Sequence, residues 1–222
     1  MSSANDFAPF LEVTRGRIVE SIHFGAMAVV DSSGKLLASC GNAETVTFLR
    51  SSAKPFQALP FVERGGVETF GLAEKELALI CSSHSGTDEH LEVVRGIQAK
   101  VGIEENFLRC GTHPVSDEPT ARDMLLRDEE PTSNRHNCSG KHTGMLAHAK
   151  MRGLPLENYI DLAHPVQQTI LQTFSEMCSL EPSQVEVGVD GCSVPTFAVP
   201  LKSAAWAMAK LCDPGKLPEA RA

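Results

Sequence analysis

The chain has 222 residues, of which 42% are hydrophobic and 22% charged, a composition typical of a globular protein with one substantial core or two small domains. Its net charge of −8 and the lack of a basic stripe argue against nucleic-acid binding, because phosphate backbones are bound by clustered Lys and Arg. No apolar stretch approaches the roughly 20 residues that cross a bilayer, and the N-terminus lacks a signal-peptide pattern. Seven scattered cysteines without a Cys-x-x-Cys pair suit a reducing compartment, so a cytoplasmic location is expected.

The first quarter of the chain predicts β-strands. Within residues 17–40, two apolar runs flank the turn sequence DSSGK at residues 31–35, which predicts a hairpin. A third short strand is predicted at residues 45–49.

Helical patterns dominate the remainder. The clearest is at residues 87–101, where Thr87 can cap a helix and Leu91, Val94 and Ile97 recur at helical spacing. The other predicted elements are helices at 51–64, 73–80, 120–127, 144–151, 165–177 and 200–211, and a strand at 185–190. This order predicts an α/β (α+β layered) fold with a mixed β-sheet flanked by helices, organised as a single domain over residues 1–222.

Four short segments concentrate reactive side chains among small residues, in the setting of turns where functional groups often lie. They are RSSAKP at 50–55, CSSHSGTDEH at 81–90, NCSGKHTG at 137–144 and VDGCSVP at 189–195.

The first segment contains the pattern Ser-x-x-Lys. Ser51 and Lys54 share one face of a helix, so Lys54 could accept the hydroxyl proton of Ser51 if burial lowered its pKa. The alternative is that Ser51 caps a helix and Lys54 is a solvated lysine of its first turn. Ser52 is a competing hydroxyl without the same spacing to Lys54.

Each of the other segments has a structural alternative as well. Ser82, Ser83 and His84 could bind an amide or carboxylate, or cap the following helix. Cys138, beside Lys141, could be a metal ligand, a nucleophile or a buried small residue. Asp190 could bind a ligand at the end of a strand or simply form a turn.

Taken in order, the segments RSSAKPFQALP, CSSHSG, HNCSGKHTGML and DGCSVPTFAVPL resemble the L-asparaginase II family of the Rhizobium etli thermolabile type. The resemblance extends to EVTRG and ESIHFGAMAVVD near the N-terminus. It implies hydrolysis of L-asparagine to L-aspartate and ammonia on a fold similar to serine β-lactamases and penicillin-binding enzymes, and it suggests a homodimer.

The resemblance also implies roles for individual residues. Ser51 matches the nucleophile, Lys54 its base and Ser83 a second active-site serine. A zinc position that modulates substrate binding matches Cys138, Lys141 and Cys192. The charged ends of the substrate need partners, for which the candidates are Arg50, Ser82, His84 and Asp190.

One feature of the family has no match in this chain. A second lysine, which pairs with the second serine, lies in a later region of family members, so the resemblance implies that the chain is truncated at its C-terminus and that Ser83 lacks its partner. Two other functions are compatible with the motifs: a β-lactamase-like serine hydrolase, and a non-catalytic relic that binds an amino acid or zinc. Against the former, the chain offers only SDE and KHTG where Ser-Asp-Asn and Lys-Thr-Gly are expected.

Overall fold

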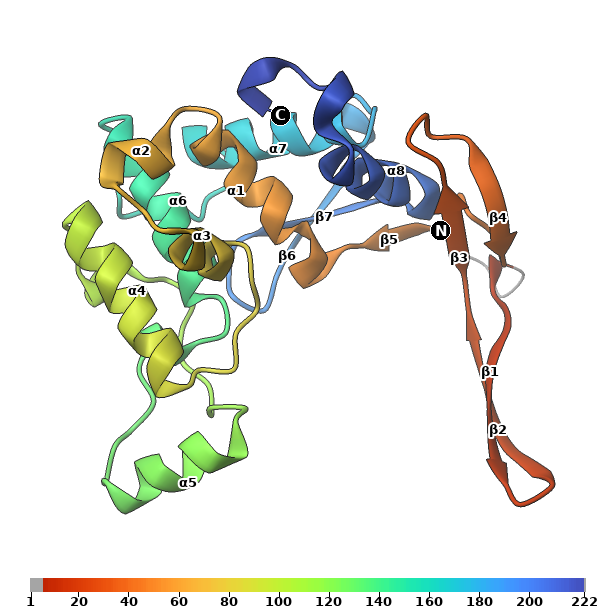
Figure 1. Ribbon diagram of the computed structural model, residues 1–222, viewed down its shortest axis with the longest axis horizontal. Coiled ribbons are helices and arrows are strands. Elements are labelled where there is room, and N and C mark those ends of the chain that lie inside the picture. The colour runs from red at the N-terminus through yellow and green to blue at the C-terminus, as the bar shows by residue number, and fades with distance from the viewer. Residues whose placement is uncertain (1–5, 222) are drawn as a thin grey trace.

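The computed structural model describes residues 6–221, which form a helical body and an arm of antiparallel strands (Figure 1). The strands and α-helices, in chain order, are β1 Ala8–Arg15, β2 Ile18–Gly25, β3 Met27–Val30, β4 Leu36–Cys40, β5 Val46–Phe48, α1 Lys54–Val62, α2 Gly66–Phe70, α3 Glu74–Ile80, α4 Asp88–Val101, α5 Glu118–Leu126, α6 Ser139–Met151, α7 Pro165–Met177, β6 Glu186–Val189, β7 Pro195–Pro200 and α8 Leu201–Cys212.

The arm consists of two hairpins, β1–β2 and β3–β4, which extend away from the helices (Figure 1). It meets the body where α8 contacts β3. The turn between β3 and β4 packs closely on this helix, because a Cβ atom at Gly34 would lie 2.5 Å from the ring of Trp206. This turn is the one predicted from DSSGK, with the Asp31 carboxylate accepting from the backbone N–H groups of Ser33 and Lys35.

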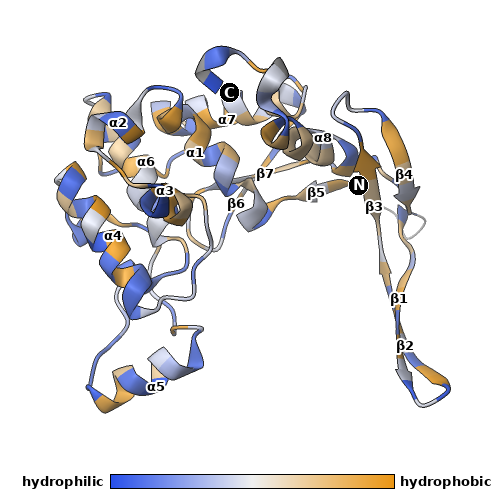
Figure 2. Ribbon diagram, viewed as in Figure 1, coloured by the Kyte–Doolittle hydropathy of each residue, from blue (hydrophilic) through white to orange (hydrophobic). Residues whose placement is uncertain are grey.

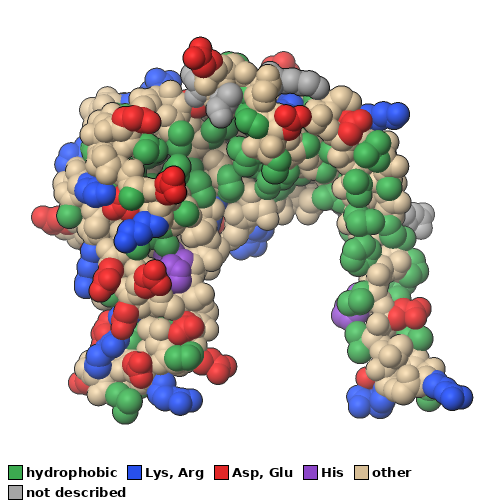
Figure 3. Space-filling model, in the orientation of Figure 1, with side chains coloured by type: hydrophobic (Ala, Val, Ile, Leu, Met, Phe, Trp, Pro, Cys, Tyr) green, Lys and Arg blue, Asp and Glu red, His purple; other side chains and the backbone are tan. Residues whose placement is uncertain are grey.

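Hydrophobic residues occur along the strands of the arm (Figure 2), and the space-filling view shows many of their side chains on its surface (Figure 3). Phe10, Leu11, Ile18 and Phe24 are each more than half exposed. Exposed apolar patches of this kind commonly mark surfaces that another part of a protein covers.

The third sheet has the order β5-β7-β6 and lies in the body. Its central strand is buried along almost its whole length. A single mixed sheet is therefore not what the described residues form: they make three small sheets in which every pairing is antiparallel. The two hairpins join neighbouring strands through short turns, and such turns permit only antiparallel pairing.

The core lies between α1, α6, α7 and β7. Phe174 of α7 contacts the ring of Phe56 edge-on at 5.8 Å and stacks on Phe197 of β7 at 5.0 Å. Residues 139–149 of α6 are all buried, which makes α6 a central helix of the body (Figure 1). No helix in the part of the chain that the structure describes is long and apolar enough to cross a membrane.

Candidate active site

The Ser-x-x-Lys segment forms a tight turn between β5 and α1. Residues Arg50–Ala53 are a 3-10 turn, and the α-helix begins only at Lys54. Arg50 opens the turn with a φ of 51°, a left-handed conformation that is uncommon for residues other than glycine. The turn leaves Ser51 exposed and directs Lys54 into the core, where it is 1% exposed.

Lys54 connects three of the four segments singled out from the sequence. Its Nζ donates hydrogen bonds to the carbonyl oxygens of Ser82 at 2.8 Å and Asn137 at 3.3 Å. Burial lowers the pKa of the Lys54 ammonium; a nearby Cys138 opposes this shift and the charge of Lys141 adds to it. Lys54 is thus a lysine whose proton is more easily lost than that of an exposed lysine.

The second segment, between α3 and α4, presents its serines differently. Ser82 is half-buried, and Ser83 is exposed. His84 is buried, and its ring nitrogens hydrogen-bond to the backbone of Gly86 and the hydroxyl of Ser139. Of the three, Ser83 has the side chain most open to a ligand.

The third segment runs into the start of α6, which packs against the end of α3. A Cβ atom at Gly140 would lie 2.4 Å from the carbonyl oxygen of Leu79. Only glycine permits this approach, and it brings the first turn of α6, with Cys138 and Lys141, into the interior beside Lys54.

The cysteines of the third and fourth segments meet at Lys141. The amine of Lys141 donates to the sulfur of Cys192 at 2.9 Å. The S–H group of Cys138 lowers the pKa of the Cys192 thiol, and His142 and Lys141 lower it further, against the effect of burial. The same contact with Cys192 raises the pKa of the Cys138 thiol. Of the two sulfurs, Cys192 is thus the one whose negatively charged form its neighbours stabilise.

Asp190 closes the ring of contacts. Its carboxylate lies 2.8 Å from a guanidinium nitrogen of Arg50, so the turn between β6 and β7 is paired with the Ser51 turn. The Asp190 side chain is 11% exposed, whereas that of Arg50 is 63% exposed. The four segments predicted from the sequence thus lie together, joined by Lys54, by Lys141 with Cys192, and by Arg50 with Asp190.

Tyr159 supports the site but carries no motif that would single it out. Its hydroxyl accepts from the backbone N–H of Arg109 at 2.9 Å and hydrogen-bonds to Nδ1 of His142 at 2.6 Å. The His142 side chain also interacts with Cys192, whose pKa it lowers. A lone tyrosine 17 residues from the histidine it orients gives no local sequence signal.

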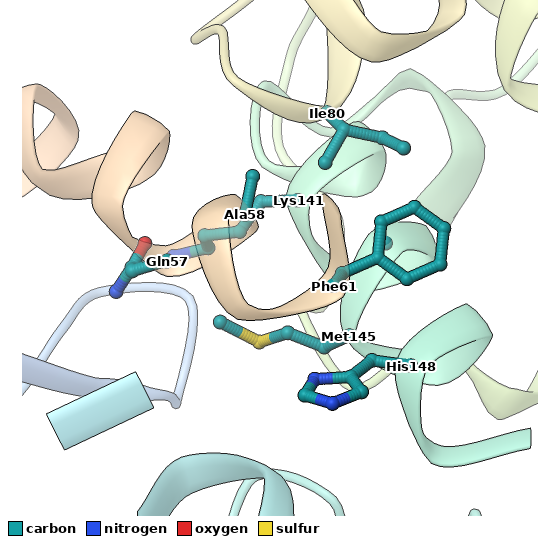
Figure 4. Close-up of a pocket in the computed structure, with 8 residues that line it drawn as sticks. Gln57, Ala58, Phe61, Ile80, Lys141, Met145 and His148 are labelled. Carbon is teal, nitrogen blue, oxygen red and sulfur yellow. The ribbon is translucent and has the colours of Figure 1, made fainter. Parts of the chain in front are cut away.

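A small cavity lies behind the site, between α1 and α6 (Figure 4). Gln57, Phe61, Met145 and His148 line it, and Lys141 forms part of its wall. His148 is therefore on the same helix as Lys141 but takes no part in the contacts described above.

Cysteine and lysine, rather than a conventional cluster, are the possible metal ligands here. Within residues 6–221, no group of three or more His, Cys, Asp or Glu side chains is placed to hold a metal ion. The two sulfurs and the Lys141 amine nevertheless converge. Sulfur is a preferred ligand of zinc, so this donor set fits a zinc ion when Lys141 is counted as the third ligand.

The fold and the site together define a mixed α/β protein with a buried cluster of lysine and cysteine side chains close to the exposed residues Ser51 and Ser83. The family model for L-asparaginase II matches residues 11–222, and the chain belongs to that family. A search of curated proteins finds no match. Family membership indicates an amidohydrolase that acts on a small molecule.

Proposed function

We propose that this protein hydrolyses L-asparagine to L-aspartate and ammonia, with Ser51 as the nucleophile and Lys54 as its base. The observation that carries the proposal is the buried amine of Lys54, whose pKa is lowered, one helical turn after an exposed serine in a chain of the L-asparaginase II family.

The chemistry is an acyl transfer. Neutral Lys54 accepts the Ser51 proton as the hydroxyl oxygen attacks the side-chain amide carbon, and it then returns the proton to the departing ammonia. Water releases aspartate in the second step. In the described residues Lys54 bonds to carbonyl oxygens and not to Ser51, so the amine must turn toward the hydroxyl when it loses its proton. A serine–lysine pair at the start of a helix is also what supports a relation to the serine β-lactamase fold.

Arg50 and Asp190 are suited to the charged ends of the substrate. Most of the Arg50 guanidinium is exposed, so it retains N–H donors for the α-carboxylate. The Asp190 carboxylate is the complementary partner for the α-ammonium group. The Ser82 carbonyl accepts a hydrogen bond from Lys54, and the neighbouring exposed Ser83 is the second serine available to the substrate.

We propose a zinc ion as a modulating cofactor, held by Cys138, Lys141 and Cys192. Bound zinc would supply a positive charge beside the substrate pocket. Lysine binds a metal only as a neutral amine, so zinc uptake must release protons and weaken as the pH falls. Titration with Co²⁺ in place of zinc should produce a sulfur-to-metal absorption band that Cys192→Ser abolishes. Cys178→Ser is the control, because Cys178 is also a buried free cysteine but makes no hydrogen bond to Lys54 or Lys141.

The decisive experiment measures ammonia release from L-asparagine and L-glutamine. Ser51→Ala should abolish release, whereas Ser52→Ala, which removes the neighbouring exposed hydroxyl, should retain most of it. Normal rates in Ser51→Ala would refute the assignment. Ser51-dependent turnover of nitrocefin would favour a β-lactamase-like hydrolase, and asparagine binding by calorimetry without ammonia release would favour a non-catalytic binding protein.

Two further properties are proposed. The seven free cysteines support a cytoplasmic location. A homodimer is the expected assembly, and the exposed apolar side chains of β1 and β2 provide a surface that a second copy could cover. Sedimentation velocity should show a dimer that Ile18→Glu dissociates.

A further inference from the structure

His84 occupies a central place in the segment that carries the two serines. The segment joins α3 to α4. Its backbone directs the carbonyl group of Ser82 toward Lys54, while Ser83 is exposed. The His84 side chain is only 5% exposed, so it faces the interior and not the side of the segment on which Ser83 lies open.

The hydrogen bonds of His84 fix its tautomer. Nδ1 accepts from the backbone N–H of Gly86 at 3.1 Å and so carries no proton. Nε2 lies 2.8 Å from the hydroxyl of Ser139, whose own hydrogen is donated to the carbonyl of Asn134 at 2.8 Å. The proton between the ring and Ser139 therefore belongs to Nε2. His84 is a neutral imidazole with both nitrogens engaged, consistent with a pKa that burial lowers to about 4.

The same residue connects the serine segment to the residues before α6. The backbone N–H of His84 donates to the carbonyl of Asn137 at 3.2 Å, and this carbonyl also accepts from Lys54. The second carbonyl bound by Lys54 belongs to Ser82, two residues before His84. His84 thus binds one of the two carbonyl groups that hold the proposed base, and the other lies two residues before it in the same segment.

We infer that His84 is a positioning residue, which clamps the Ser82–Ser83 segment to the start of α6 and thereby fixes the two carbonyl groups that hold Lys54. This role replaces direct substrate binding, for which a ring nitrogen would have to leave an internal partner. The effect on catalysis rests on the proposed function, but the clamp itself does not.

The chain provides a closely matched control. His164 is also buried, at 4% exposed, its Nδ1 accepts from the backbone N–H two residues later at 3.2 Å, and its Nε2 hydrogen-bonds to the carbonyl of Pro155 at 3.1 Å. These hydrogen bonds of His164 lie at the start of α7, outside the four segments of the site. Substitution of His84 and of His164 removes the same kind of interaction at two places.

The test combines hydrogen–deuterium exchange with steady-state kinetics on the full chain. His84→Ala should increase deuterium uptake in residues 82–87 at least several-fold and lower kcat for L-asparagine about tenfold or more, with KM changed less than threefold. His84→Asn should restore much of the protection and of kcat, because the asparagine oxygen can accept from the N–H of Gly86. His164→Ala should leave uptake in residues 82–87 and kcat near the wild-type values.

Two results would overturn the inference. Unchanged uptake in residues 82–87 of both His84 variants would show that no clamp exists. A raised KM with unchanged kcat would assign His84 to substrate binding. If the wild-type protein releases no ammonia, the proposed function fails, while the exchange measurement still decides the role of His84; if His84→Ala does not fold, His84→Asn and Ser139→Ala provide the comparison.

Discussion

Lys54 illustrates how burial can give a single lysine the properties of a base. Its ammonium is held in the interior by two carbonyl groups, and burial is the main reason that its pKa lies below the ordinary value of 10.5. A base acts in its deprotonated form, so kcat/KM should rise with pH and level off at a pH below 10.5. Lys54→Arg keeps the positive charge but cannot lose it, and it should reduce kcat by about 10²–10⁴-fold.

The pH profile of kcat/KM and the rate of Lys54→Arg provide this measurement. Lys100→Arg, at a half-exposed lysine paired with Glu76, is the control and should retain the wild-type rate. A fully active Lys54→Arg enzyme would exclude Lys54 as the base.

Arg50 shows conformational strain at a residue of the proposed site. A non-glycine residue at a φ of 51° costs about 1–2 kcal/mol, and the partner Asp190 holds the Arg50 side chain in place. Arg50→Gly and Arg50→Ala both remove the ion pair, but only glycine adopts this conformation without a steric cost. Urea unfolding should show Arg50→Gly to be more stable than Arg50→Ala by about 1 kcal/mol. Equal stabilities would show that the turn relaxes when the side chain is lost.

At the scale of elements, the packing of α6 on α3 positions the cysteine and lysine cluster. The added Cβ of Gly140→Ala would collide with the Leu79 backbone, so this change should destabilise the protein by about 1–3 kcal/mol and disturb the site. Gly96→Ala in α4 is the matched control, because its Cβ would meet only the end of the Glu76 side chain at 3.4 Å. It should stabilise the protein by about 0.5–1 kcal/mol through helix propensity, and thermal unfolding measures both effects.

The same packing explains which elements could be predicted from the sequence. The amphipathic helix at 87–101 is confirmed as α4 because Thr87 caps it and Gly102 ends it in a left-handed conformation. The helix predicted at 144–151 begins instead at Ser139, because tertiary burial stabilises a Gly- and Ser-rich first turn that has no amphipathic pattern. Strands β1 and β7 and the five-residue α2 were not predicted, since none has a distinctive pattern at its length.

The four segments of the candidate site could be predicted from the sequence, but the contacts that bring them together could not. Local spacing linked Ser51 to Lys54, and only the order of the motifs suggested that the others belonged with them. Arg50 and Asp190 lie 140 residues apart in sequence, and Lys54 and Asn137 lie 83 apart. Contacts at such separations follow from how α1, α6 and the β6–β7 turn pack, which no local pattern specifies.

For the whole molecule, the buried histidines predict loss of stability in acid. Burial lowers the pKa of His84 and of His148 from the ordinary 6.5 to about 4. Between these values the unfolded chain binds a proton at each histidine that the folded protein does not. The stability that these residues contribute is complete above pH 6.5 and is lost as the pH falls toward 4, by about 1.4 kcal/mol per pH unit for each histidine.

Urea unfolding at a series of pH values measures this dependence, and His148→Gln separates the two histidines. His148 lines the cavity between α1 and α6, and its Nε2 has no hydrogen-bond partner, so glutamine removes a titrating group without removing such a bond from that nitrogen. The variant should show a pH dependence between 4 and 6.5 that is shallower than that of the wild-type protein by about one proton. If the two slopes are equal, His148 is not the neutral buried group that its surroundings indicate, and the acid sensitivity must arise at His84 and the other titrating residues.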